Sequence, residues 1–150
     1  MAALSAITPV VEMATTPAGV HTYTVSYLFV RDSSWVNVRA NNTPAKRAAT
    51  LAHEQIHFDI AELVARKLRQ RIAQGLRVGE DLHLPQAAQA IARIQTEEDT
   101  LDAQFDLASK QADGYVQDAL VRTRWQQRLT RELAALAAYK SRPEDCPQQP

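Results

Sequence analysis

Two histidines and a glutamate form the pattern in this sequence that indicates a specific chemistry. His53, Glu54 and His57 follow one another as H-E-x-x-H, and residues four apart on a helix stand on one face. Both imidazoles can therefore bind a single metal ion, with the glutamate carboxylate beside it. Zinc lowers the pKa of a bound water, and Glu54 can accept its proton. The pattern predicts a zinc hydrolase in which His53 and His57 bind Zn²⁺ and Glu54 is the general base.

The motif lies in a segment with the features of one long helix. Thr43 can cap a helix that begins at Pro44, and neither glycine nor proline recurs before Gly75. The apolar residues between these points recur at three- and four-residue spacing, so they form one stripe, which the two histidines border. The members of this expected buried stripe are Ala48, Leu51, Ala52, Ile56, Ile60, Leu63, Val64, Leu68 and Ile72.

The segments around this helix predict an α+β domain. A run rich in β-branched and aromatic residues from Val20 to Val30 favours a strand, and Trp35 to Arg39 favours a second strand that would complete an antiparallel hairpin. Two further helices are expected, from about Gln86 to Lys110 and from Tyr115 to about Arg142, with a break at Asp113-Gly114. The expected fold is a minimal zincin-like domain, with a small antiparallel hairpin packed on the motif helix and two more helices.

Composition indicates a single domain and gives no sign of a charged partner. A chain of 150 residues with 45% hydrophobic content can bury one core, which we expect over residues 1–142, with residues 1–19 poorly ordered and a flexible proline-rich tail over residues 143–150. The 17 basic and 17 acidic residues balance. This balance favours neither nucleic acid nor an anionic membrane as a partner. The lone Cys146 allows no internal disulfide.

We expect no secretory signal or transmembrane helix from this sequence. Residues 1–19 lack a basic n-region and are interrupted by prolines, so they make a poor secretory signal. No segment approaches the apolar length of a transmembrane helix. As written, the sequence is expected to be cytoplasmic or to be a mature form without its targeting segment.

A third zinc ligand must come from outside the motif, because catalytic zinc usually has three protein ligands. Four candidates remain. Asp113 lies at a helix junction where the chain can return to the motif helix, and Glu98 lies on an otherwise apolar stripe, where an unpaired carboxylate is costly. Asp106 lies on the second expected helix and His83 in the loop before it. Each has a structural alternative: a helix cap for Asp113, an ion pair for Glu98, solvent for Asp106 and an ordinary loop position for His83.

The residues around the motif resemble a known family. Gln55, Phe58, Asp59 and Glu62 extend the pattern to H-E-Q-x-H-F-D-I-A-E, which is similar to the predicted secreted zinc-dependent proteases, a bacterial domain family of otherwise uncharacterised function. The dense part of the resemblance runs over residues 51–69. It implies a zinc metalloprotease that acts on a peptide or protein substrate, and a secreted or periplasmic location.

The downstream pattern of that family is only partly present. It comprises an aromatic-Asp pair, then Thr-x-His-Gly, then a tryptophan, and its histidine is the implied third ligand. Phe105-Asp106 and Trp125 can be aligned with it, but Gln111 stands where the histidine is expected, and Asp113-Gly114 matches only with an insertion. Either Asp113 replaces the histidine, as in the two-histidine, one-aspartate site of aspzincins, or the site has two ligands and is inactive. We favour Asp113, because the motif itself is intact.

Two rivals to a metallopeptidase stay open. One is a catalytically inactive zincin-like interaction domain. The other is a di-iron helical bundle, since Glu54-x-x-His57 is also E-x-x-H and Glu80-x-x-His83 repeats it, although Gly79 and Pro85 leave little helix around the repeat. If the chain is a peptidase, the edge strand from Trp35 to Arg39 can bind an extended substrate by strand addition.

Overall fold

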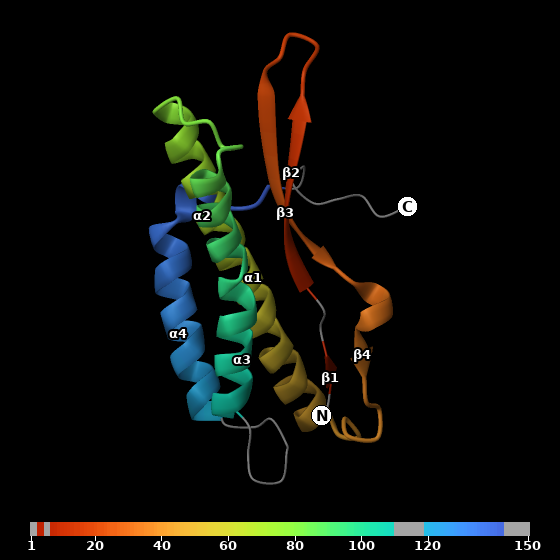
Figure 1. Ribbon diagram of the computed structural model, residues 1–150. Helices are drawn as coiled ribbons and strands as arrows, with labels where there is room; N and C mark the ends of the chain where they lie inside the picture. The colour runs from red at the N-terminus through yellow and green to blue at the C-terminus, as the bar shows by residue number, and fades with distance from the viewer. Residues whose placement is uncertain (1–2, 5–6, 110–118, 143–150) are drawn as a thin grey trace.

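A computed structural model describes residues 3–4, 7–109 and 119–142 and has a mixed α+β architecture (Figure 1). The long helix α1, Pro44–Arg77, lies between a two-stranded antiparallel hairpin on one side and the shorter helices on the other. These helices are α2, Pro85–Gln95; α3, Glu97–Ser109; and α4, Ala119–Ala135, followed by the 3-10 turn η2, Ala137–Tyr139. The predicted α+β class is confirmed.

The motif helix begins as predicted but ends later. The Thr43 side chain accepts a hydrogen bond from the backbone N–H of Lys46 at 3.2 Å, which caps the helix. The helix continues through Gly75 to Arg77, and Gly79, with a φ of 71°, reverses the chain. At Gly75 the surrounding side chains approach closely, since a Cβ there would lie 2.5 Å from a Glu80 carboxylate oxygen.

The hairpin differs from the prediction in its partner strand. β3, His21–Phe29, forms as expected, but it pairs with β2, Ile7–Thr15, with Ile7 opposite Phe29 and Thr15 opposite His21. The turn between them uses Gly19, whose φ of 77° suits glycine. Ile7–Thr15, which belongs to the segment expected to be poorly ordered, thus forms a regular strand. Pro9 did not exclude a strand, because each strand of a two-stranded ribbon has an edge where a missing N–H is tolerated.

The second predicted strand is shorter than expected. β4 covers only Trp35–Val36 and pairs with β1, Ala3–Leu4. The rest of the predicted strand, up to Arg39, contains a turn, in which the Asn37 side chain accepts a hydrogen bond from the backbone N–H of Ala40 at 3.1 Å. An asparagine side chain that bonds the backbone nearby favours turns over strands. This segment therefore does not form the long edge strand proposed for substrate binding.

The second predicted helix is divided at Thr96 into α2 and α3. The Thr96 hydroxyl donates to the Arg93 carbonyl at 2.9 Å, and three acidic residues follow in the first turn of α3. A threonine that bonds the backbone and acids at a helix start both favour a new N-terminus at this point. The third predicted helix is found over Ala119–Ala135, and the proposed break at Asp113-Gly114 lies outside the described residues.

Two apolar clusters lie along α1. Near its C-terminal half, Val64, Leu68 and Ile72 pack with β3 and α2, while near the motif Ile56, Ile60 and Leu63 pack with α3 and α4. The predicted stripe is thus largely buried, but Ala48 and Leu51 are exposed, because they precede the part of α1 that these clusters cover. In the described part of the chain, no helix has the length and apolar character needed to cross a membrane.

Candidate metal site

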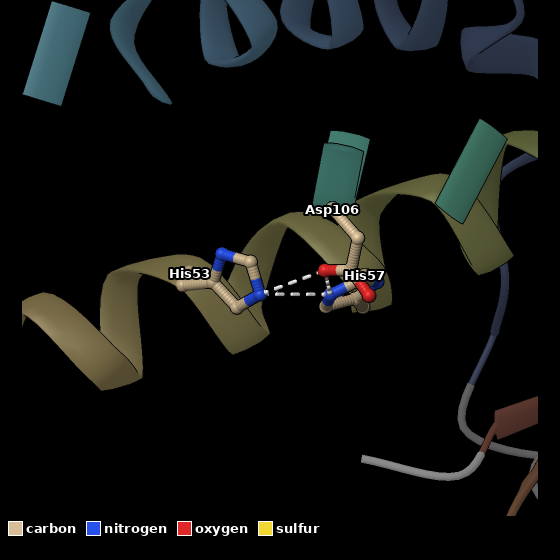
Figure 2. A group of neighbouring side chains, drawn as sticks. All are labelled: His53, His57 and Asp106. Carbon is tan, nitrogen blue, oxygen red and sulfur yellow. Dashed lines mark hydrogen bonds and ion pairs between the residues drawn. The ribbon is translucent and has the colours of Figure 1, made fainter. Parts of the chain in front are cut away.

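His53 and His57 lie one turn apart on α1 and are largely buried against α3. The ring of Phe105, which is fully buried, stacks on His53 at a centroid distance of 4.6 Å and meets His57 edge-on at 5.3 Å. These contacts restrict both imidazole rings. The result is that the two Nε2 atoms point toward each other, 3.1 Å apart (Figure 2).

The side chain of Asp106, on α3, points toward the two histidines and forms a three-residue group with them (Figure 2). One of its carboxylate oxygens lies 3.2 Å from His53 Nε2 and 3.4 Å from His57 Nε2. Ligands at the vertices of a tetrahedron around zinc, each about 2.0–2.1 Å from the ion, are about 3.3 Å apart. The three donor atoms therefore already have the spacing, and the two-nitrogen, one-oxygen chemistry, of a zinc site with an open position.

The other three candidate ligands have different surroundings. Glu98 lies on α3 but is not part of the three-residue group. His83 packs against His21, at a ring distance of 4.9 Å, near the end of the hairpin. Asp113, the ligand preferred from the sequence, lies outside the described residues, so its role stays a prediction. Of the candidates that the structure describes, Asp106 is the one that faces the histidines.

Proton affinity at the site follows from this geometry. Burial lowers the pKa of His57, but hydrogen bonds to Asp102 and Asp106 outweigh burial and raise the pKa to about 10. Hydrogen bonds to Asp106, mainly from His53 and then from His57, hold the pKa of its carboxyl group well below the usual range. Without metal, the site is thus a carboxylate facing a protonated histidine.

Zinc binding should consequently displace a proton from the site even at pH values well above the ordinary pKa of histidine. Zinc must displace the proton from His57, whose pKa is about 10, so we expect the apparent zinc affinity to rise by about tenfold per pH unit from pH 6 to pH 8. Competition titrations with a chromophoric chelator would measure this slope. An affinity that levels off above pH 7, as for a histidine of pKa 6.5, would contradict the assignment.

Asp102 supports His57 from outside the group, a role that the sequence analysis missed. Its carboxylate oxygen lies 2.8 Å from His57 Nδ1, which leaves Nε2 to bind metal. The available signal was its position four residues before Asp106, which places both carboxylates on one face of α3. Such partners orient a ligating imidazole and increase its basicity.

Removing this support should weaken metal binding without removing a ligand. We expect Asp102→Ala to lower zinc affinity by about 10- to 100-fold, the usual effect of losing a carboxylate behind a histidine ligand. Asp99→Ala, which removes an exposed carboxylate from the same helix, is the matched control and should leave the affinity unchanged. Equal affinities for the two variants would show that Asp102 does not position His57.

Glu98 is a buried carboxyl one helical turn before Asp102. It is 3% exposed, and its Oε1 has no hydrogen-bond partner among the described residues. Burial, together with the charges of Asp102 and Asp99, raises its pKa to about 8. The Glu98 side chain is accordingly neutral at pH 7, although the charge of His57 partly opposes the rise of its pKa, and this explains how an acid fits on a buried face.

A neutral amide should therefore replace Glu98 well. Because the pKa is raised on folding, Glu98 is best tolerated below pH 4.5, and its contribution to stability falls as pH rises toward 8. We expect Glu98→Gln to match the wild type at pH 4 and to be more stable by several kcal/mol at pH 8.5, because each pH unit between the unfolded and folded pKa values contributes about 1.4 kcal/mol. Urea unfolding of the zinc-free proteins at both values measures this. If Glu98→Gln is instead less stable than the wild type by the same amount at pH 4 and pH 8.5, Glu98 forms a stabilising polar interaction in the folded protein.

Glu54 sits on α1 directly after His53, with a partly buried side chain. Its Oε2 is buried and, within the described residues, has no hydrogen-bond partner. A carboxylate oxygen that is withdrawn from solvent and unpaired is costly unless something else binds it. Glu54, which follows His53 on α1, is therefore available to bind a water molecule or a substrate group.

The motif's other residues have structural contacts. Asp59 accepts a hydrogen bond from the Gln55 side chain at 3.1 Å, so it is Asp102 and not Asp59 that supports a histidine. Glu62 pairs with Arg66 at 2.7 Å and accepts a hydrogen bond from the backbone N–H of Ser141 at 3.0 Å. Glu62 thereby fixes the end of the described chain against α1.

The second E-x-x-H does not form a metal site with the first. Glu80 pairs with Arg71, with nitrogen-to-oxygen distances of 2.6 and 2.7 Å. His83 contacts His21 instead of the motif histidines. These contacts remove the geometric basis for the di-iron bundle.

Comparison with known proteins assigns neither a family nor a function to this chain. Neither the protein-family models nor the curated proteins and solved structures gave a match to this chain. The resemblance of the motif to the secreted zinc-dependent protease family stays a prediction. What the site does must therefore be inferred from its own residues.

Proposed function

We propose that this protein is a zinc-dependent metallopeptidase. The observation that carries the proposal is the group formed by His53, His57 and Asp106, whose donor atoms lie 3.1–3.4 Å apart, with the Glu54 carboxylate adjacent on α1. Two imidazoles and one carboxylate are a ligand set found in zinc hydrolases. In this proposal Asp106, and not Asp113, is the third ligand.

The protein's own residues supply the remaining parts of peptide hydrolysis. A zinc ion held by the three ligands would supply Lewis acidity, which activates water and polarises a carbonyl group. Glu54 accepts the proton of the attacking water and then delivers it to the nitrogen of the departing amine. Asp102 holds His57 in the tautomer that leaves Nε2 for the metal, and Phe105 holds both rings in place.

Turnover by metal-loaded protein tests the proposal. We expect purified protein loaded with one equivalent of zinc to cleave members of a broad peptide library, as detected by mass spectrometry of the new termini. A chelator should abolish the cleavage and added zinc should restore it. If zinc binds with the expected stoichiometry and no peptide is cleaved, the inactive interaction domain is the better account.

A further inference from the structure

An apolar face of α1 adjoins the proposed base. Leu51, Glu54 and Phe58 stand at positions i, i+3 and i+7, so they share one face of the helix. Leu51 is 70% exposed, so most of its side chain is open to contact. The carboxylate of Glu54 thus has a large apolar side chain on each side along the helix axis.

The end of β3 adds a second aromatic ring to this face. Phe29, the last residue of β3, meets Phe58 at a centroid distance of 5.7 Å and is itself 36% exposed. The pair forms an apolar wall where the end of β3 meets α1, while α3 carries Asp106 to the histidines on another side of α1. Leu51, Phe58 and Phe29 are together called the apolar face below.

Helical geometry places Glu54 between this face and the metal ligands. At about 100° per residue, the direction of Glu54 lies about 60° from that of His57 and about 40° from that of Phe58. When the carbonyl group of a substrate peptide reaches the metal ligands, the peptide lies next to Glu54. A substrate side chain beside that carbonyl can then contact the apolar face. Apolar surface beside convergent polar groups is the usual make-up of a substrate site.

We propose that the apolar face binds a large apolar side chain of the substrate, next to the peptide bond that is cleaved. This inference rests on the proposed metallopeptidase function and names its substrate class: peptides with leucine, phenylalanine, methionine or tryptophan beside the scissile bond. Contact with such a side chain removes the exposed surface of Leu51 and Phe29 from water. A small polar residue at the same position gains nothing from this contact.

The test compares two peptides that differ only in this side chain. Library cleavage first identifies the position enriched in large apolar residues, and paired peptides with leucine or alanine there are then assayed. We expect Leu51→Ala to lower the leucine-to-alanine ratio of kcat/KM by about tenfold. Val78→Ala, which shortens an equally exposed apolar residue at the other end of α1, should leave the ratio at the wild-type value.

A binding measurement provides a readout that does not depend on turnover. In the Glu54→Gln background the leucine peptide stays intact, so its Kd can be measured by fluorescence anisotropy. We expect added Leu51→Ala to weaken the binding of the leucine peptide by several-fold more than that of the alanine peptide. A Phe29→Ala change in the same background should act in the same direction.

Failure of the inference can be told apart from failure of the proposed function. If the zinc-loaded protein cleaves no peptide, the metallopeptidase proposal falls and the substrate assignment falls with it. If peptides are cleaved without enrichment of large apolar residues, or if Leu51→Ala leaves the leucine-to-alanine ratio unchanged, the apolar face is not a substrate site although the metallopeptidase proposal stands.

Discussion

Glu54→Gln should lower kcat for peptide hydrolysis by about 100- to 10,000-fold while the protein still binds zinc. The amide has nearly the same size as the carboxylate but cannot accept the proton of the attacking water, and this is the usual contribution of a positioned general base. The effect corresponds to about 3–5 kcal/mol of transition-state stabilisation. Because Glu54 is not one of the three ligands, zinc affinity should change little.

Asp59→Asn is the matched control for this change. It makes the same replacement of a carboxylate by an amide on the same helix, at a residue whose carboxylate bonds the exposed Gln55 side chain. We expect kcat within a factor of about two of the wild type, as for surface changes of little energetic effect. If both variants lose activity equally, or if Glu54→Gln retains activity, Glu54 is not the base.

Asp106→Asn should have the second large effect, on metal binding. The change removes the negative charge from the proposed third ligand, whose oxygen lies 3.2 Å and 3.4 Å from the two histidine nitrogens. Losing a direct ligand should cost more than the 10- to 100-fold typical of residues behind the ligands, so we expect zinc affinity to fall by more than about 100-fold. Competition titration measures it, and circular dichroism checks that the helices remain.

The decisive control is Asp113→Asn, because Asp113 is the ligand that the sequence favours. If Asp106 completes the site, Asp113→Asn should bind zinc as tightly as the wild type does. The opposite pattern, with tight binding in Asp106→Asn and weak binding in Asp113→Asn, would restore the sequence-based assignment and reject the one proposed from the structure.

Local patterns predicted the helical part of the fold well. The motif helix was recognisable because its cap at Thr43, its first-turn proline and its periodic apolar residues all favour the same structure. Its end was harder to predict. Gly75 resembles a stop signal, yet the helix continues to Arg77, and the side chains of Glu80 and Leu82 pack close to Gly75. A local pattern does not reveal contacts that the chain makes after it turns back.

Strand pairing depended on information that local patterns do not contain. The strand His21–Phe29 was predicted, but its partner could lie on either side of it in the sequence. The upstream segment contains Pro9 and Pro17, but a two-stranded ribbon tolerates a proline at its edge, and Gly19 supplies the turn. The downstream alternative failed because Asn37 forms a turn with Ala40.

The metal site was predictable only in part, for a similar reason. His53, Glu54 and His57 belong to one helix, so their spacing alone places them together. The proposed third ligand lies on another helix, and its identity depends on how α3 lies against α1. Asp102 and Asp106, four residues apart, form a pair on one face of α3, and such a pair of carboxylates was the signal that could have singled out this helix.

Diffraction from zinc-containing crystals at the zinc absorption edge tests the central claim most directly. The account predicts an anomalous peak about 2.0–2.2 Å from Nε2 of His53, Nε2 of His57 and a carboxylate oxygen of Asp106. A peak at which Asp113, Glu98 or His83 takes the place of Asp106, or the absence of zinc from the two histidines, would contradict it.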